Sequence, residues 1–191
     1  EASSLGQEAI SLAQRMSNVR AGVIAAANGL WVEMELGALD GLDDKLRQLL
    51  DRLEQDGAPY AEPECRLLLA RVLLSHGNRK EALLQAELGR DRAQSLHMER
   101  ESLILEVLLQ RMKGMDMAAE EMASGFEALR ARATDYGAMG EVAWSWEQEG
   151  IVRRSIGDEP GAVSCFQEGL SLARKMGYEL FARRCEEALK S

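Results

Sequence analysis

The chain has 191 residues, of which 46% are hydrophobic, 29% are charged and 5% are aromatic. Few aromatic residues and only three prolines argue against a β-sandwich or barrel, and favour helices. A net charge of -9 argues against a nucleic-acid-binding surface and against attachment to an anionic membrane, because both need clustered Lys and Arg. The same acidity suits either a well-solvated surface or the recognition of basic partners.

Apolar residues recur at helical spacing along the whole sequence, which predicts about ten helices and no strand. No linker is long enough to divide the chain, so residues 1–191 are predicted to form a single repeat array. The predicted helices cover residues 3–17, 19–36, 42–56, 63–76, 79–96, 98–113, 116–133, 138–156, 159–176 and 179–190.

One group of four positions, spaced 4, 3 and 4 residues apart, recurs five times and lies on one face of a helix. The copies start at residues 5, 42, 82, 118 and 162, so they are 37, 40, 36 and 44 residues apart. A helical unit at this period is typical of a helix-pair solenoid, in which each unit buries its apolar face on its neighbours. We therefore expect Ala82, Ala118 and Ala162 to be buried where paired helices approach closely.

Glycines mark the turns between the predicted helices. Gly37, Gly77 and Gly157 each stand five residues before a copy of the four-position pattern. Glycine adopts the left-handed conformation that ends a helix, so we expect these residues to terminate one helix before the next begins. Asp158 is expected to cap the helix that follows it.

Residues 146–173 carry a family resemblance. Trp146, Gly150, Gly157, Ala162 and Phe166, followed by a small residue at 169, stand at the spacing of the tetratricopeptide repeat (TPR). Departures are Glu149 and Arg153 where Leu and Tyr are expected, a missing repeat-ending proline, and a period longer than 34. The long period resembles the TPR-like arrays of MalT-type bacterial regulators. This resemblance implies an all-α, right-handed TPR-like helix-pair solenoid.

In TPR arrays the first helix of each pair lines a concave groove, and the resemblance implies which residues here would face it. They combine tryptophans, aliphatic residues and arginines, which are side chains that often anchor interfaces. The predicted groove residues are Trp31, Met34, Leu67, Arg71, Arg100, Leu103, Val107, Arg111, Trp144 and Arg154. The alternative is that the aliphatic residues and tryptophans pack against neighbouring repeats. Of the two nearby tryptophans, we expect Trp146 in the core and Trp144 in the groove.

The sequence lacks the motifs of a catalytic, metal or nucleotide site. The two histidines, His76 and His97, fall at predicted helix ends, where the helix dipole alone favours them. There is no zinc-ligand spacing and no phosphate-binding loop, so no metal and no cofactor are expected. Three widely spaced cysteines suggest reduced thiols and a cytoplasmic location.

These observations predict a non-enzymatic module that binds a protein or peptide ligand, as part of a cytoplasmic regulatory or signalling protein. Grouped arginines inside an acidic protein predict an acidic ligand. The alternatives are an effector-sensing domain of a MalT-type transcriptional regulator and a self-association domain. Because the chain starts at Glu1 and the repeat pattern is running by Leu5, we expect a segment of a longer protein.

Overall fold

The computed structural model describes residue 11, residues 19–56 and residues 58–191. This part of the chain contains nine α-helices, one short 3₁₀ helix and no strand, so the all-α prediction is confirmed. The predicted helix at 3–17, with its copy of the repeat pattern, lies outside the described residues apart from residue 11. The other helices begin and end within three residues of their predicted bounds: α2 Val19–Glu35, α3 Leu42–Asp56, η1 Pro59–Ala61, α4 Glu62–Ser75, α5 Arg79–Ser95, α6 Glu99–Gly114, α7 Ala119–Asp135, α8 Met139–Ser155, α9 Glu159–Met176 and α10 Glu179–Ala188.

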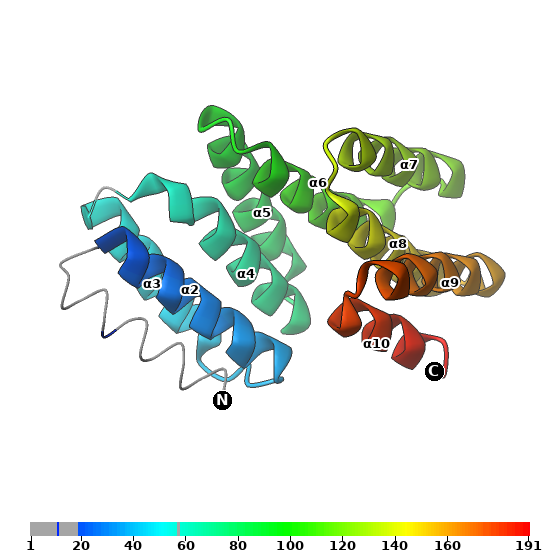
Figure 1. Ribbon diagram of the computed structural model, residues 1–191, viewed down its shortest axis with the longest axis horizontal. Coiled ribbons are helices and arrows are strands. Elements are labelled where there is room, and N and C mark those ends of the chain that lie inside the picture. Colours follow the sequence, from blue (N-terminus) through cyan, green and yellow to red (C-terminus); the bar gives the residue numbers. More distant parts are fainter. Residues whose placement is uncertain (1–10, 12–18, 57) are drawn as a thin grey trace. The chain divides into compact units, whose positions relative to one another are not determined.

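The described helices form two compact units, which divide between Ser102 and Leu103. In the first unit α2 packs on α3, α3 on α4, and α4 on α5 (Figure 1). In the second unit α7 packs on α8, α8 on α9, and α9 on α10. Within each unit, consecutive helices therefore pack on one another as in a helical solenoid. The right-handed twist of the array stays a prediction.

The glycines at the turns have the left-handed conformation that the sequence predicts. Gly37, Gly77 and Gly157 have φ angles of 78°, 77° and 84°, in the left-handed region. The amide of Gly157 donates to the carbonyl of Arg154, and the next amide donates to the carbonyl of Arg153, so the freed carbonyls at the helix end are satisfied. The Asp158 side chain accepts from the amide of Gly161 and caps α9.

The four-position pattern forms one buried stripe on each of the helices α3, α5, α7 and α9. The prediction holds for the stripes that begin at Leu42, Ala82 and Ala162, all of which are fully buried. It is wrong for Ala118, which is exposed and is the N-cap residue of α7. The stripe of α7 begins one turn later, and its four buried residues are Met122, Phe126, Leu129 and Ala133.

With this correction the repeat becomes regular. The stripes start at Leu42, Ala82, Met122 and Ala162, each 40 residues after the one before. The sequence misplaced this stripe because the turn between α6 and α7 has no positive-φ glycine equivalent to Gly37, Gly77 and Gly157. Met117 stands at that place in the period. A constant period means that equivalent positions of successive helix pairs can be compared directly.

The corrected stripe predicts that the same substitution has effects of very different size at two alanines. Ala162→Leu adds volume to a fully buried site and is expected to lower the free energy of unfolding by roughly 1–3 kcal/mol. Ala118→Leu lies on the exposed N-cap of α7 and is expected to change it by less than about 0.5 kcal/mol. Urea unfolding followed by circular dichroism measures both, and equal losses would contradict the assigned stripe.

Candidate binding cleft

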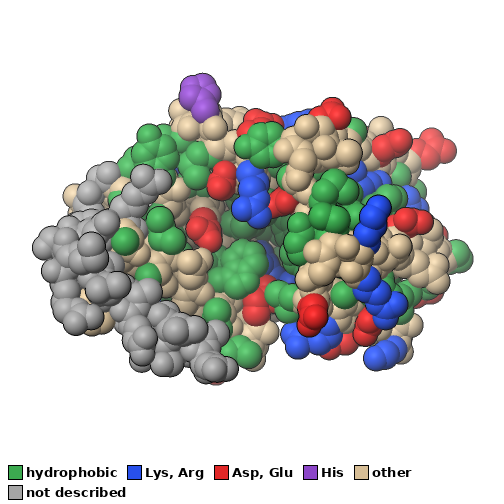
Figure 2. Space-filling view, viewed as in Figure 1, with side chains coloured by type: hydrophobic (Ala, Val, Ile, Leu, Met, Phe, Trp, Pro, Cys, Tyr) green, Lys and Arg blue, Asp and Glu red, His purple; other side chains and the backbone are tan. Residues whose placement is uncertain are grey.

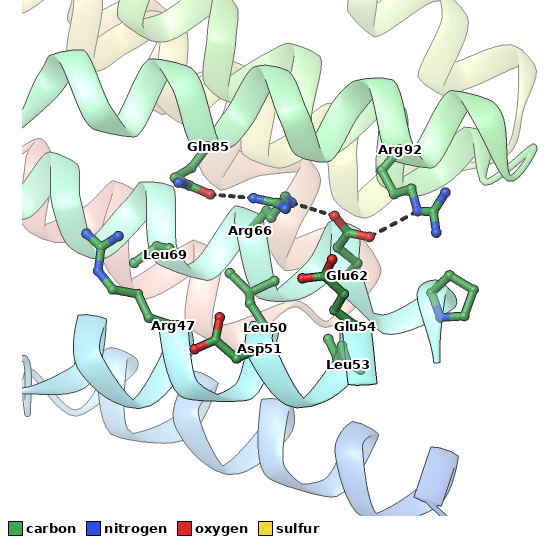
Figure 3. A pocket seen from close by; sticks show the side chains of 11 residues that line it. Arg47, Leu50, Asp51, Leu53, Glu54, Glu62, Arg66, Leu69, Gln85 and Arg92 are labelled. Carbon is green, nitrogen blue, oxygen red and sulfur yellow. Dashed lines mark hydrogen bonds and ion pairs between the residues drawn. The ribbon is translucent and has the colours of Figure 1, made fainter. Parts of the chain in front are cut away.

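A cleft of about 600 Å³ lies in the first unit, between α3 and α5 and across α4. Its lining comes from four elements: η1 contributes its first residue, Pro59, and α3, α4 and α5 contribute the rest. The helical lining residues are Arg47, Leu50, Asp51, Leu53, Glu54, Glu62, Arg66, Leu69, Gln85 and Arg92. Figure 3 shows these side chains, with α3 on one side, α5 on the other and α4 between them.

Helical spacing explains why these residues face the cleft. On α3, Arg47, Asp51 and Glu54 are 4 and 3 residues apart, so they share a face that flanks the buried stripe. On α5, Gln85 and Arg92 are seven residues apart and share a face in the same way. Because α3 and α5 both pack on α4, these flanking faces lie on opposite sides of the cleft (Figure 3).

The arginines of the cleft are already held by acceptors of the same unit. The Arg66 guanidinium donates to the carboxylate of Glu62 at 2.8 Å and to the side-chain oxygen of Gln85 at 2.7 Å. Arg92 donates to the second oxygen of Glu62 at 3.0 Å. These four side chains make one connected chain of contacts in Figure 3. The remaining arginine of the lining, Arg47, donates to Glu81 at 2.5 Å and links the two walls.

Two carboxylates of the cleft are not held in this way. Asp51 and Glu54 are exposed on α3, and no hydrogen bond or ion pair of the described structure engages either one. Arg47 precedes Asp51 by one turn, but its guanidinium is turned to Glu81. The lining also includes two half-buried apolar residues, Leu50 and Pro59. The cleft thus combines open negative charge with apolar surface.

Four of the predicted groove residues are inside the protein. Leu67, Leu103, Val107 and Trp144 are at most 6% exposed. Burial of this extent is not consistent with a role as open ligand contacts, and it agrees with the alternative that such residues pack within the array. Trp144 is therefore more deeply buried than Trp146, the reverse of the expectation.

Two of the remaining predicted residues of the first unit, Trp31 on α2 and Arg71 on α4, are in contact. Arg71 lies over the ring of Trp31, 5.0 Å from its centroid, and donates to Glu35 at 2.9 Å. Met34 is half-buried on the same helix as Trp31. Arg100 lies apart from this group, on the exposed surface near Glu64. Burial and the charge of Glu101 raise the pKa of Glu64, and the charge of Arg100 opposes that rise.

The predicted arginines of the second unit are occupied as well. Arg111 donates to the side chain of Gln148 at 2.8 Å. Arg154 donates to the carboxylate of Glu159 at 2.7 Å and to the carbonyl oxygen of Ala188 at 2.7 Å. An anionic ligand would have to compete with these acceptors, so the arrangement does not support a groove of open positive charge.

Helix α8 carries an ionic cluster that sequence reasoning placed only in part. Glu149 is 1% exposed and accepts from Arg130 and Arg153, each at 2.6 Å. Arg130 also lies over the ring of Trp146, 3.6 Å from its centroid. The pairing of Arg153 with Glu149, one turn apart, is the one that helical spacing predicts. No pattern in the α8 sequence indicates that Arg130, which lies on α7, joins the cluster.

The described part of the chain shows neither a candidate metal site nor a candidate membrane-spanning helix. It contains no group of three His, Cys, Asp or Glu side chains placed to hold a metal ion. Among the helices described, none has the length and apolar character needed to cross a membrane. The three cysteines are free and buried, and burial raises the pKa of the Cys65 thiol to about 12. On the face drawn in Figure 2, basic and acidic side chains of the described residues lie beside one another, without a broad basic area.

Comparison with known proteins supports the fold. The structure resembles that of BtubC (BKLC) from P. vanneervenii, with a TM-score of 0.63 and 14% sequence identity over 99% of this chain and 88% of that chain. No protein-family model matches the sequence, and no curated protein matches it. At this identity the likeness concerns the helical architecture alone.

The Glu149 cluster predicts a large difference between two acidic residues. Glu149→Ala leaves Arg130 and Arg153 without their buried acceptor and is expected to lower the free energy of unfolding by about 3–5 kcal/mol. Glu186→Ala removes an exposed partner of Arg174 and is expected to lower it by at most about 1 kcal/mol. Chemical denaturation of both variants checks this, and a loss at Glu149 as small as that at Glu186 would contradict the role of the cluster.

Proposed function

We propose that this chain is a non-catalytic binding module that holds a peptide segment of a partner protein in the cleft between α3 and α5. The observation that carries the proposal is the cleft itself, about 600 Å³ in volume and lined by apolar and charged side chains. A volume of this size is typical of ligand-binding clefts. The array of packed helices supports the proposal, because helical solenoids present extended binding surfaces.

The lining favours a polypeptide over a small apolar effector. Small-molecule sites are mostly apolar with a few polar groups. Here six of the eleven lining residues are charged, and the apolar ones lie between them. A peptide offers backbone polar groups and alternating side chains, which suit such a mixed surface. The resemblance to TPR-like arrays favours a regulatory protein of the cytoplasm as the setting, and three free buried thiols are compatible with a reducing compartment.

Selection from a random peptide library displayed on phage tests the proposal. The library is panned on the chain, and the affinity of the selected peptides is then measured against two variants. Leu50→Trp places a larger side chain in the cleft and is expected to weaken binding at least tenfold. Leu84→Trp makes a similar change on α5 at a 52% exposed residue outside the lining, and is expected to leave binding unchanged.

Two results would contradict the proposal. One is a selection that yields no peptide above background. The other is a set of peptides that bind wild type and Leu50→Trp equally, while both proteins keep the same helical content. A selection that fails for peptides while a small-molecule screen yields ligands sensitive to Leu50→Trp would support the effector-sensing alternative instead.

A further inference from the structure

We infer that the ligand of the α3–α5 cleft is a basic segment of a partner protein, bound in an extended conformation with two Arg or Lys side chains separated by one residue. This inference rests on the proposed function and adds the charge and the spacing of the ligand. It departs from the acidic ligand that the arginines in the sequence predict. Three features of the cleft carry it.

The first feature is the state of the charges. Each arginine of the lining has a carboxylate acceptor in the protein: Glu62 for Arg66 and Arg92, and Glu81 for Arg47. An anionic ligand would compete with these carboxylates for the same guanidinium groups. A cationic ligand displaces nothing, because Asp51 and Glu54 are not engaged by any group of the described structure. Charge complementarity therefore favours a cation.

The second feature is the spacing of the open carboxylates. Asp51 and Glu54 are three residues apart on α3, so their side chains start about 5–6 Å from each other on one face. In an extended peptide, residues i and i+2 point to the same side and are about 6.6–6.8 Å apart. Two basic residues separated by one residue therefore match the two carboxylates. Adjacent basic residues point to opposite sides and match only one.

The third feature is the apolar part of the lining. Leu50 and Pro59 are half-buried and line the cleft together with Asp51 and Glu54. The aliphatic stem of an Arg or Lys side chain packs on such a surface while its charged end reaches a carboxylate. A guanidinium can also bind a carboxylate through two parallel hydrogen bonds, which makes arginine the better fit.

Three fluorescein-labelled peptides test the inference by fluorescence anisotropy with the full chain, at about 50 mM NaCl so that screening is modest. The matched peptide is Gly-Arg-Ser-Arg-Ser-Leu-Gly. Its spacing control is Gly-Arg-Arg-Ser-Ser-Leu-Gly, with the same composition, and its charge control is Gly-Glu-Ser-Glu-Ser-Leu-Gly. We expect the matched peptide to bind, the spacing control to bind severalfold more weakly, and the acidic peptide not to bind.

Two double variants then locate the interaction. Asp51→Asn with Glu54→Gln removes both charges and keeps the side-chain shapes. This double variant is expected to lower the affinity for the matched peptide at least tenfold. Glu120→Gln with Glu127→Gln removes two charges from exposed residues of α7 and is expected to leave its affinity unchanged. All four substitutions lie at exposed positions, so helical content measured by circular dichroism should match that of wild type in both proteins.

The outcomes separate this inference from the proposed function. Equal affinity for wild type and the Asp51/Glu54 variant, tighter binding of the acidic peptide, or no binding of the matched peptide up to about 1 mM would each overturn it. If phage selection still yields peptides that depend on Leu50, the proposed function stands and only the basic ligand is wrong. If selection yields none, the binding function itself is wrong.

Discussion

The burial of one four-residue stripe on each of α3, α5, α7 and α9 is the constraint on which the rest of the fold depends. Because the stripes recur every 40 residues, each of these helices presents the same face to its partner and its flanking residues to solvent. In the first unit, the flanking residues of α3 and α5 face each other across α4. The cleft thus lies between flanking faces whose direction is set by the buried stripes, and its side chains come from α3, α5, α4 and η1.

Helix α8 shows how far the repeat tolerates polar residues. Its Gln148 and Glu149 stand 40 residues after Leu108 and Leu109, which are buried leucines of α6. The polar side chains are buried as deeply as the leucines, because Arg111, Arg130 and Arg153 supply donors to them. A buried carboxylate is tolerated where charged donors surround it, whereas removal of one partner leaves an unmatched charge.

The helices and turns could be predicted from the sequence because their signals are local: a stripe at spacings of 4, 3 and 4, and a glycine before it. The error at Ala118 arose where two registers one turn apart share Met122 and Leu129, and only the constant period of 40 separates them. The binding residues were harder to predict, because whether a side chain is open to a ligand depends on partners that are distant in the sequence. Arg71 is held by Glu35, 36 residues away, and no pattern within one helix indicates such a pair. The cleft itself joins residues of α3, α4 and α5, whose meeting follows from packing alone.

In the proposed function, ligand binds between α3 and α5, and not on the face of α2 and α4 that the TPR resemblance implies. Methyl NMR of the chain, titrated with a peptide selected from the phage library, tests this most directly. Binding in the cleft is expected to shift the methyl resonances of Leu50 and Leu69, which line it. Shifts confined to Met34 and Leu74, on α2 and α4 outside the lining, would contradict it.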